Sequence, residues 1–333
     1  MKHSIFDQPF SYNRRKIFSD GYHHLTVDGQ DWSLPLRERE LVGSIVRLWN
    51  LPRYLGRRRL KGQVASRHRP VSPMADGYAL CRGDGVPGLA EALDVCEAKL
   101  ATYLAFTEGR GELRESFDPD AYRQEMAKTA RDPIRHVPFR HDVEAARALI
   151  RPFLQPEAFL VAANYLGVLP VLQAVRIAYS PNDEAEGLIS SQMFHMDPEG
   201  ARQVKVFVAA RDVGPENSPL TFVPEAISAR ALASHDEALL GRRVPDKVML
   251  RHAPKPTWVA HEGPRGTMVF IDTSRCFHYG SRPAPKPRLL LYAQYLDPFC
   301  SVFAARKFGG KLAKSYRFYP TDDPVEQHLL AMR

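Results

Sequence analysis

FHMDPEG, residues 194–200, places two metal-ligating side chains, His195 and Asp197, two positions apart. A further histidine, His278, follows much later in RCFHYGSR. Two imidazoles and one carboxylate on one face of an ion leave its other positions open, and this ligand set is typical of non-haem iron. The proline and glycine after Asp197 suit a strand end that runs into a turn, where both ligands can converge. Taken singly, the HxD pattern also fits a surface turn, and His278 fits a core histidine.

Arg288 lies ten residues after His278 and opens the apolar run RLLLYAQYL. An arginine that enters such a strand is costly unless an anion pairs with it. Its planar guanidinium matches a carboxylate through two hydrogen bonds, so 2-oxoglutarate is one suitable anion. Alone, Arg288 also fits an internal ion pair. Other histidines, His252, His261 and the pair His23–His24, offer no HxD spacing, so the set His195, Asp197, His278 is favoured.

The bulk composition indicates a folded, basic protein. The chain has 333 residues, 44% of them apolar, a net charge of +8 and a pI of about 9.3. This permits nucleic acid, a membrane surface or an anionic small molecule as a partner. Four cysteines without CxxC spacing favour a reducing compartment. We find neither a signal-peptide pattern nor about 18 consecutive apolar residues, so we expect a cytoplasmic protein and no membrane partner.

The chain changes character near residue 170. Periodic apolar residues predict helices over 36–50, 88–106, 118–130, 142–153 and 156–167. Afterwards short β-branched runs predict strands at 171–180, 204–213, 219–224, 266–272 and 288–296, with helices at 224–240 and 324–332. No strict βαβ alternation occurs, which favours a sandwich or barrel. We expect one domain over 1–333, with a helical flank (1–170), a β-core (171–300) and a C-terminal extension (301–333).

A basic run follows the first of these helices. Seven cationic side chains crowd into residues 53–69. One interpretation is a phosphate- or nucleic-acid-binding patch. The other is a solvated surface segment, which we favour because few aromatic side chains are available there for base stacking. The preceding helix carries Leu41, Ile45 and Leu48 on one face, a spacing typical of an amphipathic helix.

Three segments together resemble a known family. SQMFHMDPEG, SPLTFVPEAISARA and GTMVFIDTSRCFHYGSRPAPKPR resemble the phytanoyl-CoA dioxygenase-like family of Fe(II)/2-oxoglutarate-dependent oxygenases over about residues 160–298. The resemblance implies an α+β fold whose core is a double-stranded β-helix (jelly-roll, cupin-like). It implies His195, Asp197 and His278 as iron ligands and Arg288 as the 2-oxoglutarate anchor. The middle segment lacks the family's usual glycine and terminal Ser-His, a departure that bears on substrate.

Four further residues are candidates for the same site. The resemblance suggests Gln192 as a cosubstrate-facing amide, although a strand-surface amide fits equally well. Ser281 and Tyr292 are candidates for hydroxyl contacts to 2-oxoglutarate. Lys205 either faces inward and binds an anion or is an ordinary exposed lysine, and we slightly favour the exposed position.

The expected activity is hydroxylation of a small molecule with O2, releasing succinate and CO2, and the positive net charge favours an anionic substrate. The presence of Asp197 favours this over halogenation, since related halogenases have a small residue there. Desaturation, epoxidation and ring formation would use the same residues. The alternatives are a cupin-type metal-binding protein without oxygenase activity, and an oxygenase acting on nucleic acid or protein. Substrate identity and oligomeric state stay open.

Overall fold

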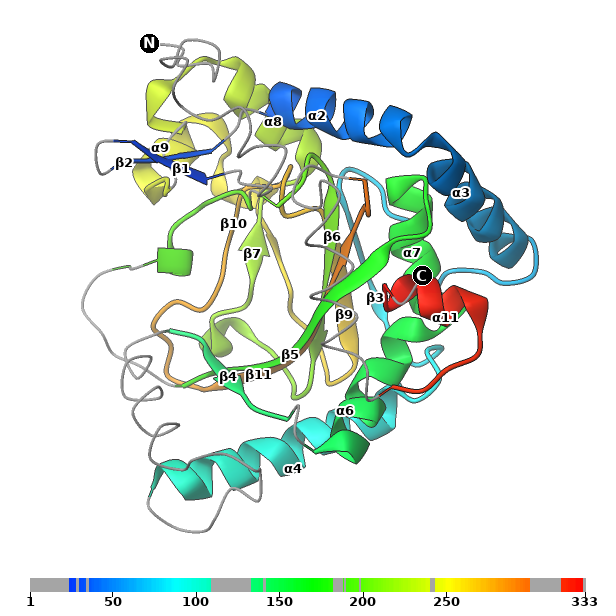
Figure 1. The fold of residues 1–333 in the computed structure, drawn as a ribbon. Helices are drawn as coiled ribbons and strands as arrows, with labels where there is room; N and C mark the ends of the chain where they lie inside the picture. The colour runs from blue at the N-terminus through cyan, green and yellow to red at the C-terminus, as the bar shows by residue number, and fades with distance from the viewer. Residues whose placement is uncertain are drawn as a thin grey trace.

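The computed structural model describes residues 24–27, 30–33, 36–108, 133–139, 142–181, 188, 190–197, 199–239, 243–299 and 319–331. Within these ranges the fold combines helices with antiparallel sheets, as predicted (Figure 1). None of the described helices has both the length and the apolar character needed to cross a membrane. The predicted jelly-roll connectivity and the division at residue 170 stay predictions.

The centre of the fold is a six-stranded antiparallel sheet. Its strands, in spatial order, are β3 (Tyr78–Arg82), β9 (Thr267–Ile271), β6 (Gln203–Ala209), β11 (Arg288–Leu296), β5 (Val171–Ser180) and β4 (Arg135–Val137). The long strand β11 lies in the middle and pairs with β5 on one side and β6 on the other. Apolar residues fill nearly every position of β11, because both of its faces are covered.

The strand register fixes which side chains share a face. Tyr292 of β11 lies opposite Arg176 of β5 and Phe207 of β6. Arg288 lies opposite Ser180, and Lys205 lies opposite Gln294. Because side chains alternate along a strand, these residues all point to one face, which we call the inner face.

A small second sheet packs against the inner face. It contains β10 (His278–Tyr279), β7 (Thr221–Phe222) and β8 (Val259–Ala260), in that order. Phe222 of β7 packs with Val269 and Ile271 of β9 in one buried cluster. The site residues therefore lie between two sheets.

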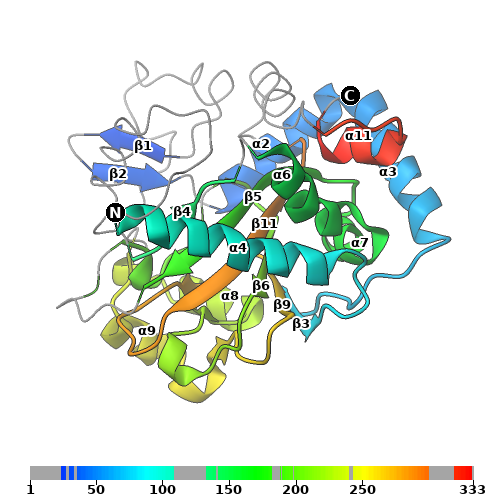
Figure 2. The ribbon, with the colours of Figure 1, turned by 90° about the horizontal axis from the view of Figure 1, so that it is seen from below.

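Helices cover the outer face of the large sheet (Figure 2). The main elements are α2 (Leu36–Trp49), α3 (Leu51–Ala65), α4 (Leu89–Thr107), α6 (Val143–Ile150), α7 (Pro156–Leu166) and α11 (Pro324–Leu329). Asp142 caps α6 by accepting a hydrogen bond from the backbone N–H of Ala145 at 3.0 Å. Gly167 ends α7 with a positive φ of 77°, as its position predicts.

Other elements lie nearer the small sheet: the short helical segments η2 (Ser190–Gln192), α8 (Glu225–Ala233), η4 (Glu237–Leu239) and α9 (Asp246–His252). The helix predicted over 224–240 is therefore wrong in length, because it stops at Ala233 and continues only as the turn η4. The helix predicted over 118–130 lies outside the described residues. Before α2, where the sequence predicts no regular element, the described residues form the hairpin strands β1 (His24–Val27) and β2 (Gln30–Ser33).

The predicted apolar stripe of α2 is the clearest disagreement between pattern and packing. The helix forms as expected, but Leu41, Ile45 and Leu48 are exposed. Helix propensity and residue spacing predict the helix, but they do not predict which of its faces packs against the rest of the protein. On α2 the buried side chains include Arg39 and Val46 instead.

Candidate metal centre

The three predicted ligands meet between the two sheets. His195 and His278 form an isolated antiparallel bridge, in which the backbone nitrogen of each residue lies 2.9 or 3.0 Å from the carbonyl oxygen of the other. The backbone N–H of Asp197 donates to Thr273 O at 2.8 Å, which fixes the turn. The candidate ligand atoms of His195, Asp197 and His278 all lie within 4.8 Å of one another, so this group could hold a metal ion. The HxD segment was predicted at a strand end, but it pairs only through isolated bridges.

Backbone carbonyls orient both imidazoles. Nδ1 of His195 lies 2.9 Å from Met193 O, and Nδ1 of His278 lies 3.1 Å from Cys276 O. A carbonyl only accepts hydrogen bonds, so each Nδ1 must carry the proton. The Nε2 lone pairs then face Asp197, at 3.9 Å from Oδ1 for His195 and 3.6 Å from Oδ2 for His278. A hydrogen bond from the ring nitrogen that does not bind the metal, here Nδ1, is the usual way in which a metal-binding histidine is oriented.

Charge in the centre also suits a cation. Burial lowers the pKa of His195 to about 3, and burial likewise lowers the pKa of His278. Both rings are therefore neutral near pH 7. Burial alone would raise the pKa of Asp197, but Lys205 and the two histidines hold it well below its usual range. Two neutral imidazoles and one ionised carboxylate are the protonation states that metal binding requires.

Lys205 reaches the centre from β6. Its Nζ lies 2.6 Å from Asp197 Oδ2, and its side chain is largely buried. The exposed position that we favoured from the sequence is therefore wrong. Alternation along β6 did place Lys205 with Phe207 on one face, but only the tertiary structure shows that this is the inner face. Because its charge pairs with Asp197, Lys205 orients that carboxylate.

Arg288 lies buried at the start of β11, with 3% of its surface exposed. Its Nη1 donates to Ser218 O, and its Nη2 donates to Ser281 Oγ at 3.1 Å. Nε is buried without a hydrogen-bond partner, and no carboxylate among the described residues forms an ion pair with Arg288. Burial lowers its pKa to about 10, so it remains a cation near pH 7.

A turn that sequence reasoning missed supports Arg288. Ser218 has a positive φ of 48°, which is uncommon for a residue with a side chain. Asn217 holds the turn by accepting from Gly214 N at 2.9 Å and donating to Pro287 O at 2.9 Å. The turn thus presents the Ser218 carbonyl to the guanidinium, and the left-handed residue is strain of the kind found at functional sites.

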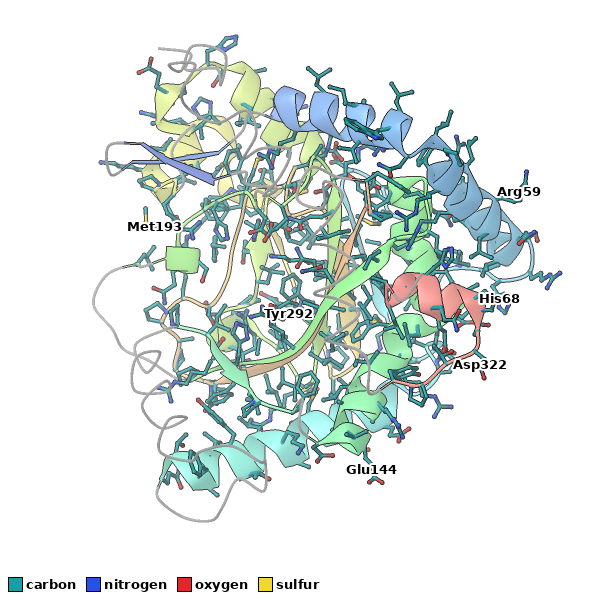
Figure 3. All side chains as sticks on the ribbon, in the orientation of Figure 1. Arg59, His68, Glu144, Met193, Tyr292 and Asp322 are labelled. Atoms are coloured by element: carbon teal, nitrogen blue, oxygen red, sulfur yellow. The ribbon has the colours of Figure 1, made fainter. Side chains whose placement is uncertain are left out.

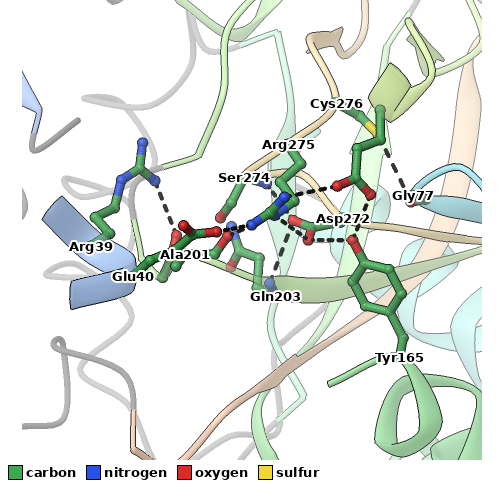
Figure 4. A network of polar contacts seen from close by, with 12 residues as sticks. Arg39, Glu40, Gly77, Tyr165, Ala201, Gln203, Asp272, Ser274, Arg275 and Cys276 are labelled. Carbon is green, nitrogen blue, oxygen red and sulfur yellow. Dashed lines mark hydrogen bonds and ion pairs between the residues drawn. The ribbon is translucent and has the colours of Figure 1, made fainter. Parts of the chain in front are cut away.

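Arg275, a half-buried arginine, is at the centre of a network of polar contacts (Figure 4). Arg275 donates to Glu225 Oε1 at 2.9 Å and to Glu40, and its Nε lies 4.0 Å from Asp272 Oδ2. The Tyr165 hydroxyl lies 3.0 Å from Glu225 Oε2 and 2.8 Å from Asp272 Oδ2. This network ties α2, α7 and α8 to the segment that leads to His278.

Arg39 of α2 completes the support. Its Nη1 donates at 3.0 Å to the carbonyl oxygens of both Asp197 and Gly200. It thereby ties α2 to the backbone of Asp197, one of the three candidate ligands. The sequence offered no signal for this contact, because it joins residues more than 150 positions apart.

The remaining predicted residues lie as follows. Ser281 contacts Arg288 and also donates to Ser180 Oγ. Tyr292 is half-buried on the inner face, and its ring centroid lies 5.5 Å from that of Phe207. Gln192 is buried in the 3-10 turn η2, and its carbonyl accepts from Arg282 Nε at 2.9 Å, so it is not a strand-surface amide.

The basic run divides between two environments. Arg57 is buried in α3 and donates to the carbonyls of Leu169, Pro170 and His328. Its neighbours Arg58 and Arg59 are exposed, and Figure 3 shows Arg59 at the outer edge of the molecule while Tyr292 lies near its centre. Part of the run is therefore structural.

No family model and no curated protein matches the chain. Three solved structures illustrate what it is similar to. EctD from S. alaskensis with 2-oxoglutarate and 5-hydroxyectoine has 18% identity, covers 70% of this chain and 74% of that chain, and gives a TM-score of 0.41. AviO1 from Streptomyces viridochromogenes Tue57 has 17% identity, with 72% and 96% covered and a TM-score of 0.42.

The third is SnoN, a non-heme alpha ketoglutarate dependent epimerase from nogalamycin biosynthesis. It has 20% identity, with 72% of this chain and 83% of that chain covered and a TM-score of 0.39. Another EctD structure contains bound Fe. These neighbours are of the kind that the sequence resemblance names. Because each TM-score is below 0.5, we take neither substrate nor reaction from them.

Proposed function

We propose that the protein is an Fe(II)- and 2-oxoglutarate-dependent oxygenase with a jelly-roll core that acts on a small molecule, hydroxylation being the expected outcome. His195, Asp197 and His278 would hold the iron. Arg288 would bind the distal carboxylate of 2-oxoglutarate, with Ser281 beside it, and Gln192 and Tyr292 would line the same site. Iron with 2-oxoglutarate would supply the activation of O2, with release of succinate and CO2.

The metal proposal is supported by the donor set. Both Nδ1 atoms are committed to carbonyls, so both Nε2 atoms are available beside an ionised carboxylate. Nitrogen and oxygen ligands in the 2-His-1-carboxylate set suit ferrous iron and leave positions open for small ligands. Two cations from distant parts of the chain contact Asp197. Lys205 donates to its carboxylate, and Arg39 donates to its backbone carbonyl.

The single observation that carries the cosubstrate proposal is Arg288. A buried guanidinium with an unpartnered Nε and no acid among the described residues is unfavourable unless an external anion completes it. A dicarboxylate with one end at the metal and the other at Arg288 would do so. A cupin-type metal-binding protein without a keto-acid cosubstrate would have no use for this arginine.

Anaerobic titration of the Fe(II)-loaded protein with 2-oxoglutarate tests the proposal. We expect a visible metal-to-ligand charge-transfer band that saturates with 2-oxoglutarate and is absent from His278→Ala. Oxygen admission should then yield succinate. A wild-type protein that binds Fe(II) but develops no band with 2-oxoglutarate would contradict the proposal and favour the cupin-type alternative.

A further inference from the structure

The inner face carries a second arginine, distinct from the one proposed for 2-oxoglutarate. Arg176 lies in the middle of β5, directly opposite Tyr292, and is exposed, although its strand neighbours Val175 and Ile177 are buried. Alternation puts Arg176 on the same face as Ala178 and Ser180, which line the inner side of the sheet. An exposed side chain at this place shows that the inner face is open to solvent beside Tyr292.

Arg176 forms no hydrogen bond or ion pair with any described residue. The other cation at this end of the inner face is not available, because Lys205 is paired with Asp197 at 2.6 Å. Of these two cations, Arg176 is therefore the one that has no acidic partner among the described residues. An ordinary solvated arginine belongs on an outer surface such as that of α3, whereas Arg176 projects from β5 onto the inner face, opposite Tyr292.

The surroundings of Arg176 suit a flat or apolar group. Phe207 and Tyr292 lie in the adjacent positions of the same row, with ring centroids 5.5 Å apart and an interplanar angle of 34°. His136 of β4 lies 6.2 Å from the Tyr292 ring, measured between centroids. Two aromatic rings, Phe207 and Tyr292, therefore lie next to each other on the inner face, and the exposed cation Arg176 lies beside Tyr292.

Electrostatics link this row to the metal centre. Burial raises the pKa of Tyr292, Arg176 and Lys205 lower it, and Asp197 and Glu199 raise it further. One hydroxyl thus lies within electrostatic reach of both Arg176 and the metal-ligand carboxylate. A molecule held over Tyr292 would lie next to the centre.

Arg176 and Arg288 mark two separate anion positions. Arg288 pairs with Ser180 in register, and Arg176 lies four residues from Ser180 along β5, a backbone separation of about 13 Å at the usual rise of a strand. Arg288 is closed off and lies near Ser281 and Ser218, whereas Arg176 is exposed. The buried position suits a cosubstrate, and the open one suits the molecule to be oxidised.

We propose that Arg176 selects a small organic anion as the substrate, binding its carboxylate or phosphate while Tyr292 and Phe207 contact its apolar body. This inference rests on the proposed function, whose site it completes. Arg176 is a specificity-determining residue in this scheme, since it holds the part of the substrate away from the metal. The sequence had suggested Lys205 for an anion, and its pairing with Asp197 moves that role to Arg176.

Calorimetric titration with matched probes tests the inference. The probes are benzoate and phenyl phosphate, their neutral partners benzamide and phenol, and the cation benzylamine. The full-length protein is loaded anaerobically with Fe(II) and saturating 2-oxoglutarate, which occupies the Arg288 position. We expect the wild type to bind an anion at least about tenfold more tightly than its neutral partner. Arg176→Gln should lose this preference, and Arg176→Glu should transfer it to benzylamine.

Arg59→Gln is the matched control, since it removes the same charge from an exposed arginine of α3 and should leave the preference unchanged. The charge-transfer band, recorded on the same samples, should have the same 2-oxoglutarate midpoint in wild type and Arg176→Gln. A wild type without anion preference, or a preference that survives Arg176→Glu, overturns the inference while leaving the oxygenase proposal intact. A loss of 2-oxoglutarate affinity in Arg176→Gln also overturns it, because Arg176 would then bind the cosubstrate. Absence of the band in the wild type is instead the failure of the oxygenase proposal.

Discussion

Arg275 and Arg288 flank His278 in the sequence, and both are largely buried, yet among the described residues only Arg275 has acidic partners. Arg275 contacts Glu225 and Glu40 directly and lies near Asp272. Arg288 contacts a carbonyl and a hydroxyl, and among the described residues no acid pairs with it. Removing a buried cation that has its own acids leaves those acids unpaired and destabilises the fold, whereas a buried cation without an acid has an unmet requirement for an anion. The contrast separates scaffold from binding site without reference to any relative.

Removing Arg275 should have the largest effect on stability. Arg275→Ala leaves the buried Asp272 and the half-buried Glu225 without their cation, so we expect a loss of about 3–5 kcal/mol in the free energy of unfolding. Urea denaturation of wild type and variant measures this. A loss below about 1 kcal/mol would show that the network is not structural and would remove one side of the contrast.

Removing Arg288 should act on ligand binding instead. Arg288→Gln should weaken 2-oxoglutarate binding by about 2–5 kcal/mol, measured through the charge-transfer band of the Fe(II)-loaded protein. Its unfolding free energy without ligand should stay level or rise, because an unpaired buried charge is removed. A variant that loses stability and keeps its affinity for 2-oxoglutarate would place Arg288 in the same class as Arg275.

A histidine near Arg288 should make the stability depend on pH. Burial lowers the pKa of His261 from an ordinary 6.5 to about 4, and the charge of Arg288 contributes to this shift. The folded protein then binds fewer protons than the unfolded chain between these values, so stability is complete above about pH 6.5 and falls as the pH approaches 4. The full effect corresponds to about 3 kcal/mol. Denaturation at several pH values should show a shallower slope for His261→Asn, and equal slopes would contradict the assignment.

Two neighbouring arginines of α3 extend the contrast to the surface. Arg57→Gln loses hydrogen bonds from a buried cation to three carbonyls and should cost about 1.5–3 kcal/mol of unfolding free energy. Arg58→Gln, its exposed neighbour, should change stability by less than about 0.5 kcal/mol. Nucleic-acid binding that depends strongly on salt and falls in Arg58→Gln would revive the interpretation of this run as a nucleic-acid site.

Local patterns predicted most of the secondary structure, because the contacts that form it are local. Asp142 and Gly167 bound their helices as expected, and β5 and β11 occupy the predicted runs. The two-residue strand β10 was beyond reach, since its pairing with β7 joins segments over 50 residues apart. The hairpin β1–β2 was missed because its mixed aromatic and charged residues show no clear period.

The site was predictable where residue type alone carries the chemistry. The donor atoms of three side chains made them candidate ligands: His195, Asp197 and His278. The guanidinium of Arg288 made it the candidate anchor for an anion. The positions of Lys205 and Gln192 were not predictable, since each depends on the direction in which a strand or turn points its side chains. Arg39 and Ser218 gave no signal at all, because a buried arginine contact and a left-handed serine are consequences of packing.

The sequence by itself determined the candidate ligand atoms, most of the helices and strands, and the cost of burying Arg288 without an anion, since these follow from side-chain chemistry and local periodicity. The tertiary structure decided which cations are already paired. Lys205 and Arg275 are paired with acids, whereas within the described chain Arg288 and Arg176 are not. Pairing is a property of distances between residues remote in sequence, and those distances exist only once the two sheets have closed on each other.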